Sequence, residues 1–499
     1  MRGCRWMLLA TGALGVLPTL APAQSWRLRF DASAQRVAFR GITPDSVSES
    51  QVITGPTGGP VSPDGFAVTC SGDGFCRYFR AGALRRGVPA SAGTDLTLWG
   101  LGIAGLRLRV HARTVTDLTG DRVWPGTSPS FRLVEGYAEY AREGLTAKLG
   151  RLLEQSRLGS AGAGGLDGIH ATYRWTAPGL ELGGYAGWGL ARGTVLPVTS
   201  PAVNPLAEFQ PGRRQVVAGA LAGVHRRSLD LEAEYRREVD TFTDYFVSER
   251  FAVSLQARPV HALRVGAGAD YDLAQGLWGS ADATIAYSGQ GVWATLGARH
   301  YRPFFDLWTV WGVFSPVPHN GISGSIAANP LSNVQLQARA EWFRYEDTET
   351  STPTVTVEDR GWRWGADAAI TLNPRWRIEA GGHRELVPGA ASGGVNGRVT
   401  WSPDEALKVS VQGGSLERPL ELRFQDAGVN WAGGAVDYRI AERWSAGLSV
   451  DRYWESRDRP DPAAFDWNQW RVSARVSLTL GSAADQWVLP PGKPRSPTP

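Results

Sequence analysis

The stretch "RVSARVSLTL" at residues 471–480 alternates polar and apolar side chains without interruption. One face of an extended strand would carry only apolar residues, namely Val472, Ala474, Val476, Leu478 and Leu480. The other face would carry Arg471, Ser473, Arg475, Ser477 and Thr479. Because successive side chains of a strand point to opposite faces, this pattern predicts a β-strand with one apolar and one polar face. The apolar face must lie against either a protein core or lipid.

The same alternation recurs along the chain in segments of similar length. Clear examples are "GLRLRVHARTV" at 105–115, "SLDLEAEYRRE" at 228–238 and "NVQLQARAEW" at 333–342. A tilted strand needs about nine to eleven residues to cross a bilayer, which matches these lengths. No Pro/Ser-rich linker divides the chain, so one architecture is expected from end to end.

The connections between these segments are of two kinds, short and long. Tight turns are expected at 103–105, 142–144, 177–179, 226–228, 258–260, 288–290, 329–331, 373–375, 402–405 and 441–443. Longer connections fall between them, for example at 117–130, 192–213, 302–318, 345–359 and 415–428. Short turns at one end and variable loops at the other are typical of an antiparallel, up-and-down β-barrel. With further strands at 25–40 and 466–480, the sequence predicts an all-β transmembrane barrel of about 22 strands, within a range of about 18–22.

The tryptophan positions favour lipid over a protein core. Beside the tight turns lie Trp175, Trp376, Trp401 and Trp444. Beside the longer connections lie Trp188, Trp278, Trp342, Trp362, Trp364, Trp454, Trp467 and Trp470. Two belts of aromatic rings at the strand ends match the girdles found at the two membrane interfaces. A soluble propeller would show a blade repeat of about 40–50 residues, and the sequence has no shared motif at that spacing.

The N-terminal residues predict export. The stretch "MRGCRWMLLATGALGVLPTLAPAQ" has two early arginines, a short apolar run and a small-residue site at 21–23. That order is typical of a cleaved secretory signal peptide. We therefore expect a signal peptide at 1–23, a single barrel at 24–480 and a Pro-rich periplasmic tail at 481–499. Export together with lipid-facing strands predicts the outer membrane of a Gram-negative-type bacterium.

A long segment at 41–92 interrupts the strand pattern near the start of the barrel. It contains "CSGDGFC", and Cys70 and Cys76 are the cysteines left once the signal peptide is removed. In an oxidising compartment two such cysteines are expected to form a disulfide. The segment is either an external loop or a small plug inside the lumen. The aromatic stretch 304–318 has no assigned role.

One stretch resembles a known family. In "EGYAEYAREGLTAKLGRLLEQSRLGSAGAGGLDGIHATYR" at 135–174, a predicted strand ends in Gly150-Arg151 and the next begins at Asp167-Gly168. This arrangement resembles a pattern in alginate-export-type outer-membrane porins. The residue after Gly-Arg is usually polar in that family, whereas Leu152 stands here. The resemblance implies a channel for polysaccharide or small solutes.

The polar face of the strands carries the candidate pore-lining residues. These are Arg107, Arg109, Arg113, Lys148, Arg174, Arg264, Arg339, Arg375, Arg377, Arg471 and Arg475. Carboxylates on the same predicted face are Asp230, Glu232, Glu234, Asp270, Asp282, Glu341, Glu379 and Asp451. A wall of one charge sign selects the opposite ion, whereas a mixed wall mostly forms cross-strand charge ladders. Both a structural role and a mild anion preference are therefore open. The Arg107, Arg109 and Arg113 group is expected near Arg471 and Arg475, with the first strand between them.

The sequence predicts a channel rather than an enzyme. No nucleophile, base and orienting group occur in a recognisable arrangement, and the seven histidines lack metal-ligand spacing, so no catalytic residue, metal or cofactor is expected. Net charge is +4, so no nucleic-acid partner is indicated. Expected partners are outer-membrane lipid, lipopolysaccharide and the barrel-assembly machinery. The first hypothesis is passive diffusion of small solutes; alternatives are a conduit for polymer export or an adhesive surface barrel.

Overall fold

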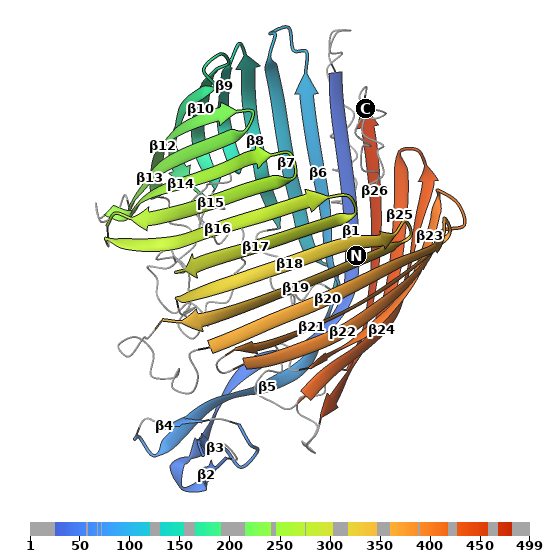
Figure 1. Cartoon of the computed structure of the whole chain (residues 1–499). Helices are drawn as coiled ribbons and strands as arrows, with labels where there is room; N and C mark the ends of the chain where they lie inside the picture. Colours follow the sequence, from blue (N-terminus) through green and yellow to red (C-terminus); the bar gives the residue numbers. More distant parts are fainter. Residues whose placement is uncertain are drawn as a thin grey trace.

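A computed structural model describes residues 25–55, 58–66, 68–70, 72–119, 130–153, 165–190, 215–240, 246–274, 276–302, 318–346, 360–387, 390–417, 427–457 and 468–481. These residues form one closed antiparallel β-barrel (Figure 1). The wall has 22 strands, because the hydrogen-bonded sheet of 24 strands includes β4 and β5, which extend beyond it. The predicted fold class and strand number are therefore confirmed.

The wall consists of β1 and of every strand from β6 to β26. Their bounds are β1 (Ser25–Ser48), β6 (Pro89–Trp99), β7 (Leu106–Asp117), β8 (Phe131–Arg142), β9 (Leu145–Leu153), β10 (Gly165–Trp175), β11 (Leu180–Gly189), β12 (Gln215–Arg226), β13 (Leu229–Asp240), β14 (Phe246–Val260), β15 (Leu263–Asp272), β16 (Leu277–Gly289), β17 (Val292–Tyr301), β18 (His319–Leu331), β19 (Val334–Tyr345), β20 (Arg360–Asn373), β21 (Trp376–Val387), β22 (Ala390–Trp401), β23 (Leu407–Glu417), β24 (Ala427–Ala441), β25 (Trp444–Arg457) and β26 (Gln469–Gly481).

The first strand closes the barrel. Strand β1 pairs with β26 on one side, where Arg27 lies opposite Gly481, and with β6 on the other, where Ser25 lies opposite Trp99. Both ends of the barrel chain therefore lie at the tight-turn end, as the strand count requires. An even number of antiparallel strands follows from this parity.

Tight turns join the strands at one end of the barrel, most of them at the predicted places. The turns predicted at 258–260 and 329–331 lie instead directly after these residues, at 261–262 and 332–333, because β14 and β18 continue to Val260 and Leu331. At the turn between β8 and β9, Glu143 and Gly144 adopt positive φ values of 51° and 87°. A Cβ atom on Gly144 would lie 2.4 Å from the backbone oxygen of Arg174 in the neighbouring hairpin. Glycine is therefore needed there both for the turn and for the close approach of the next strand.

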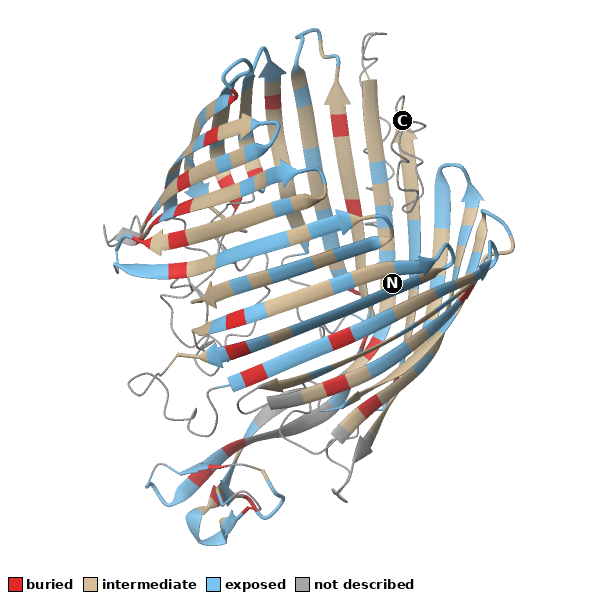
Figure 2. Ribbon diagram, in the orientation of Figure 1, coloured by how far each residue is buried: buried red, intermediate tan, exposed pale blue. Residues whose placement is uncertain are grey.

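The two faces of the wall differ in the way that the alternation predicts. Val476 is 37% exposed and Leu448 is 52% exposed, and directly opposed residues such as Ala446 share this outer face. By contrast, Glu234, Arg250 and Asp270 on the inner face are nearly buried (Figure 2). Apolar side chains outside and buried charges inside reverse the order of a soluble protein, as expected for a barrel in lipid. Among the described residues, no helix is long and apolar enough to cross a membrane.

A two-stranded ribbon leaves the barrel at the end opposite the tight turns (Figure 1). It is formed by the second half of β1 and by β5 (Phe75–Gly87), whose pairing runs from Val37–Gly87 to Ser48–Phe75. Its tip holds η2 (Glu49–Gln51), β2 (Ile53–Thr54), β3 (Pro60–Val61) and β4 (Thr69–Cys70). The predicted boundary at residue 92 differs from the structure, since β6 of the wall already begins at Pro89.

A small apolar core stabilises the ribbon tip. Cys76 is fully buried against Val47, Val68 and Tyr78, and the ring of Phe66 stacks on Tyr78 at 5.6 Å between centroids. Cys70 and Cys76 lie opposite each other on β4 and β5 and form the predicted disulfide. Non-reducing mass spectrometry of the mature protein is expected to find these cysteines linked. Two alkylatable thiols in freshly isolated membranes would contradict the pairing.

Several predicted segments differ from the structure or lie outside its described part. The closing strand predicted at 466–480 runs from Gln469 to Gly481. The signal peptide at 1–23, residues 482–499 of the tail and residues 304–317 of the aromatic stretch lie outside the described residues.

Candidate functional site: the inner wall

The inner face carries the charged residues predicted to line a pore. Directly opposed residues of paired strands share a face, so the register can be followed around the barrel. On the polar face lie Arg107, Arg109, Arg113, Lys148, Arg174, Arg264, Arg339, Arg377, Arg471 and Arg475. Arg375 lies instead in the turn between β20 and β21, where its backbone N–H donates to Oδ1 of Asn373 at 2.9 Å.

Strands β6 to β8 hold the densest group of these residues. The Arg107 guanidinium donates two hydrogen bonds to the Glu139 carboxylate, at 2.8 and 2.7 Å. Arg109 lies 3.1 Å from Asp95 on β6 and 3.2 Å from Glu135 on β8. The cation of Arg109 is therefore shared between two carboxylates, one on each neighbouring strand. This is the charge ladder expected of a mixed wall.

Three other predicted lining residues also pair with carboxylates, on the same strand for Arg377 and on a different strand for Arg339 and Arg475. Arg339 lies 3.6 Å from Asp367, Arg377 lies 2.8 Å from Glu379 and Arg475 lies 2.5 Å from Asp437. Three more of these residues contact polar or aromatic side chains. Arg113 donates to Ser91 Oγ at 3.3 Å, Lys148 lies over the Tyr137 ring and Arg471 lies over the Tyr453 ring. The wall therefore alternates in sign over short distances.

The two arginine groups predicted as close neighbours are farther apart than expected. The strand order from β26 to β7 is β26, β1, β6, β7, so two strands separate Arg475 from Arg113. The sequence prediction placed β1 alone between them. On β6 the position opposite Arg113 is Gly93, and the Asp31 carboxylate of β1 lies only 2.8 Å from the place where a Cβ atom would stand.

A recess of about 560 Å³ lies on the inner face over β13 to β16. Arg264 lines it together with Asp230 and Asp282. Gly266 and Gly268 lie opposite Thr284 and Asp282, so the floor of the recess is formed partly by backbone. Arg174 lies opposite Glu181 on the next strand, at the tight-turn end of the barrel.

The most buried of the described ion pairs is one that the sequence analysis did not predict as a pair. Arg250 on β14 and Asp270 on β15 lie 2.8 Å apart, and both side chains are 5% exposed. Asp270 also accepts the backbone N–H of Ser280 at 2.8 Å. The signal for Arg250 was present in "SERFAVSLQA" at 248–257, where Phe251, Val253 and Leu255 alternate with polar or small residues.

A second missed group is centred on one carboxylate. Glu341 on β19 contacts Arg299 at 2.6 Å and Arg363 at 2.5 Å, and its side chain is only 10% exposed. The three residues come from strands β17, β19 and β20. A single-strand pattern shows that each residue faces inward, but it does not show which charges meet across strands.

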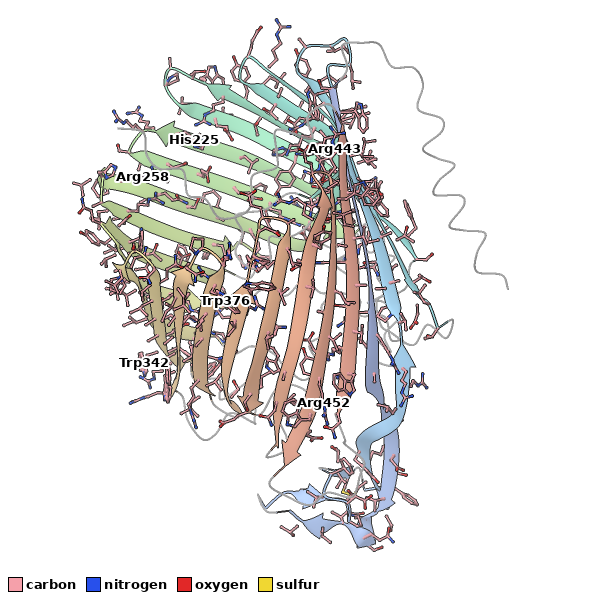
Figure 3. All side chains as sticks on the ribbon, turned by 90° about the vertical axis from the view of Figure 1, so that its right-hand side faces the viewer. His225, Arg258, Trp342, Trp376, Arg443 and Arg452 are labelled. Carbon is pink, nitrogen blue, oxygen red and sulfur yellow. A yellow bond between two sulfur atoms is a disulfide. The ribbon has the colours of Figure 1, made fainter. Side chains whose placement is uncertain are left out.

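One group of side chains has the composition of a metal site. His225, Asp230 and Glu232 offer ligand atoms that all lie within 4.8 Å of one another (Figure 3 labels His225). Nδ1 of His225 lies 2.9 Å from Asp230, and Nε2 lies 3.5 Å from Glu181. Carboxylates thus flank both ring nitrogens. The histidine spacing in the sequence did not indicate this group.

The Gly-Arg and Asp-Gly motif forms a structural contact on the outer face. Arg151 and Asp167 lie opposite each other on β9 and β10, two residues from the exposed Leu149 and Ile169. Their guanidinium and carboxylate make two hydrogen bonds of 2.7 and 2.8 Å. Arg151 also donates to the backbone oxygen of Leu133 at 2.9 Å, beside the register shift of β8. The motif therefore joins three strands.

No known family model matches the chain, and no curated protein matches it. Among solved structures, the chain is similar to the copper transporter OprC, with 12% identity, a TM-score of 0.45, and 91% of this chain and 80% of that chain covered. It is also similar to the FrpB iron transporter of Neisseria meningitidis, with 8% identity, a TM-score of 0.47, and 91% of this chain and 81% of that chain covered. A third similar structure is OccD3 (OpdP) of Pseudomonas aeruginosa, with 8% identity, a TM-score of 0.39, and 93% of this chain and 92% of that chain covered. The resemblance of residues 135–174 to alginate-export-type porins stays a prediction.

Proposed function

We propose that this protein is a passive diffusion channel for small solutes in a bacterial outer membrane. The support is a closed wall with an apolar outer face and a charged inner face. A barrel of this size is too wide for the side chains of its own wall to fill. The tight turns would face the periplasm and the ribbon would face outward, since short turns are periplasmic in such barrels.

The exposure of the inner arginines is the observation that carries the proposal. The Arg475 side chain is 70% exposed, that of Arg339 is 57% exposed and that of Arg107 is 46% exposed. Side chains of a filled interior would be buried, as those of Arg250 and Asp270 are. Every described strand lies either in the wall or in the ribbon, so none of them fills the lumen.

Single-channel recording tests this function directly. The refolded protein in a planar bilayer is expected to conduct, with a reversal potential near zero in a KCl gradient because most inner charges are paired. A small shift of the reversal potential toward the equilibrium potential of chloride would reflect the excess of arginines over carboxylates on the inner face. Absence of any conductance in folded protein would contradict the channel and favour the export or adhesive alternatives.

The membrane orientation gives a second test. A cysteine introduced at Pro374, in the turn between β20 and β21, is expected to be protected from a membrane-impermeant label in intact cells. A cysteine at Asp64, an exposed residue at the ribbon tip, should react. Labelling of Pro374→Cys with protection of Asp64→Cys would invert the orientation. Equal labelling after cell lysis serves as the accessibility control.

A further inference from the structure

The outer face near the base of the ribbon carries an unusual charge for a surface in contact with lipid. Arg36 on β1, Arg86 on β5 and Arg452 on β25 are all exposed there. Arg36 lies opposite Val472 of β26, which places it on the same outer face as Val476. Ala38, the next outward-facing residue of β1, lies opposite Arg86. The described outward-facing residues of β25, β26, β1 and β6 are otherwise uncharged, so these three cations stand on a locally uncharged part of the wall.

The register brings these arginines within reach of one another. The pairing of β1 with β6 continues into β5 without a shift, since Ala34–Ala90 is followed by Val37–Gly87. Arg36 and Arg86 are therefore diagonal neighbours, for which Cβ atoms lie about 7–8 Å apart. Side chains as long as arginine can converge over the small Ala38 that lies between them.

Two indole rings complete the group on its other side. Arg452 lies opposite Trp470, and its guanidinium carbon is 5.6 Å from the Trp470 ring centroid and 5.8 Å from that of Trp454. Trp470 is 56% exposed. Stacking holds the guanidinium plane against the rings and leaves its N–H edge available for an anion.

The position of this group along the barrel axis indicates which part of the membrane it contacts. On β25 the outward-facing side chains run from Trp444 at the tight-turn end to Trp454 at the ribbon end. Arg452 directly precedes Trp454 in this row. That length corresponds to roughly 33 Å along the strand, or about 25 Å across the membrane at the usual tilt. The two tryptophans therefore lie at opposite interfaces. Arg452 lies at the ribbon end of the barrel (Figure 3), which would place it at the level of the headgroups of the leaflet nearest the ribbon.

Charge complementarity then selects the ligand. The described outward-facing residues of β25, β26, β1 and β6 include no carboxylate, so their local charge is positive. Guanidinium groups recognise phosphate through paired hydrogen bonds. We propose that Arg36, Arg86 and Arg452, with Trp454 and Trp470, form a binding site for the phosphate groups of an anionic outer-leaflet lipid. The site rests on the membrane placement proposed above and not on conduction.

The test uses the full-length protein in detergent, with diphosphoryl lipid A as the probe and bound lipid counted by native mass spectrometry. The triple variant Arg36→Gln, Arg86→Gln, Arg452→Gln is expected to bind it more than about tenfold more weakly, since each charged contact contributes roughly that factor. Arg475→Gln, on the inner face of the adjacent strand, should bind as the natural protein does. Equal binding by the triple variant would overturn the site.

Two further binding measurements distinguish lipid phosphate from acyl chains and from free phosphate as the ligand. Fully dephosphorylated lipid A should bind weakly to every variant, and equally strong binding would show contact with acyl chains alone. Millimolar inorganic phosphate should not displace the lipid, and full displacement would assign the site to free phosphate. Heat-modifiable gel mobility verifies folding, with Arg86→Gln alone as the substitute if the triple variant does not fold. Unchanged conductance in the triple variant and in Arg86→Gln, whose substitutions all lie on the outer face, keeps this result distinct from the channel test.

Discussion

Replacement of Val476 by arginine is expected to destabilise the barrel by roughly 2–4 kcal/mol, the cost of a cation on the lipid face near the membrane midplane. Val476 is 37% exposed and lies opposite Ala32 of β1 and Ala446 of β25, which are both apolar. No carboxylate lies beside it on this face. The loss can be measured by refolding into lipid vesicles, scored by heat-modifiable gel mobility across a urea series.

The residue next in sequence supplies the matched control. Arg475 faces the lumen, and its pair with Asp437 is largely exposed, with 70% and 36% of the two side chains accessible. Exposed ion pairs contribute little to stability, so Arg475→Ala should change it by less than about 1 kcal/mol and alter conductance instead. Equal folding defects in Val476→Arg and Arg475→Ala would mean that both faces are buried in protein, which would contradict the membrane barrel.

The contrast between these neighbours shows what sequence patterning can predict. Alternation within a strand assigns each residue to a face of the sheet. Because the alternation from Arg471 to Leu480 is strict, it fixes which of these residues face lipid and which face the lumen. The turn positions then determine the parity of the strands, which is why the closure of β1 against β26 follows. Both inferences use only local order along the chain.

Contacts between strands are not determined in this way. Whether Arg109 meets Asp95 or Thr97 depends on the stagger between β6 and β7, and no single strand contains that information. The ribbon was missed for a related reason. Pro44 and its neighbours in β1 carry turn signals, but a two-stranded ribbon has an unpaired edge on which proline is tolerated. Pairing with β5 therefore overrides the local preference.

The buried pair Arg250–Asp270 leads to the second large expected effect. Asp270→Ala removes the carboxylate that lies 2.8 Å from the Arg250 guanidinium, where both side chains are 5% exposed. It also removes the acceptor for the Ser280 backbone N–H. Loss of one partner leaves the other charge buried without its counterion, so the free energy of unfolding should fall by about 3–5 kcal/mol. Urea unfolding followed by tryptophan fluorescence in micelles measures this change.

Two companion variants show whether burial causes the loss. Asp437→Ala breaks an ion pair of similar length but high exposure, and it should cost less than about 1 kcal/mol. The double variant Arg250→Met, Asp270→Leu removes both charges together, so it should recover much of the stability lost in Asp270→Ala. A double variant as unstable as Asp270→Ala would instead assign the loss to the Ser280 contact and to packing. An equal cost for Asp270→Ala and Asp437→Ala would mean that water reaches both pairs, and the inner wall between β14 and β15 would then be open to the lumen.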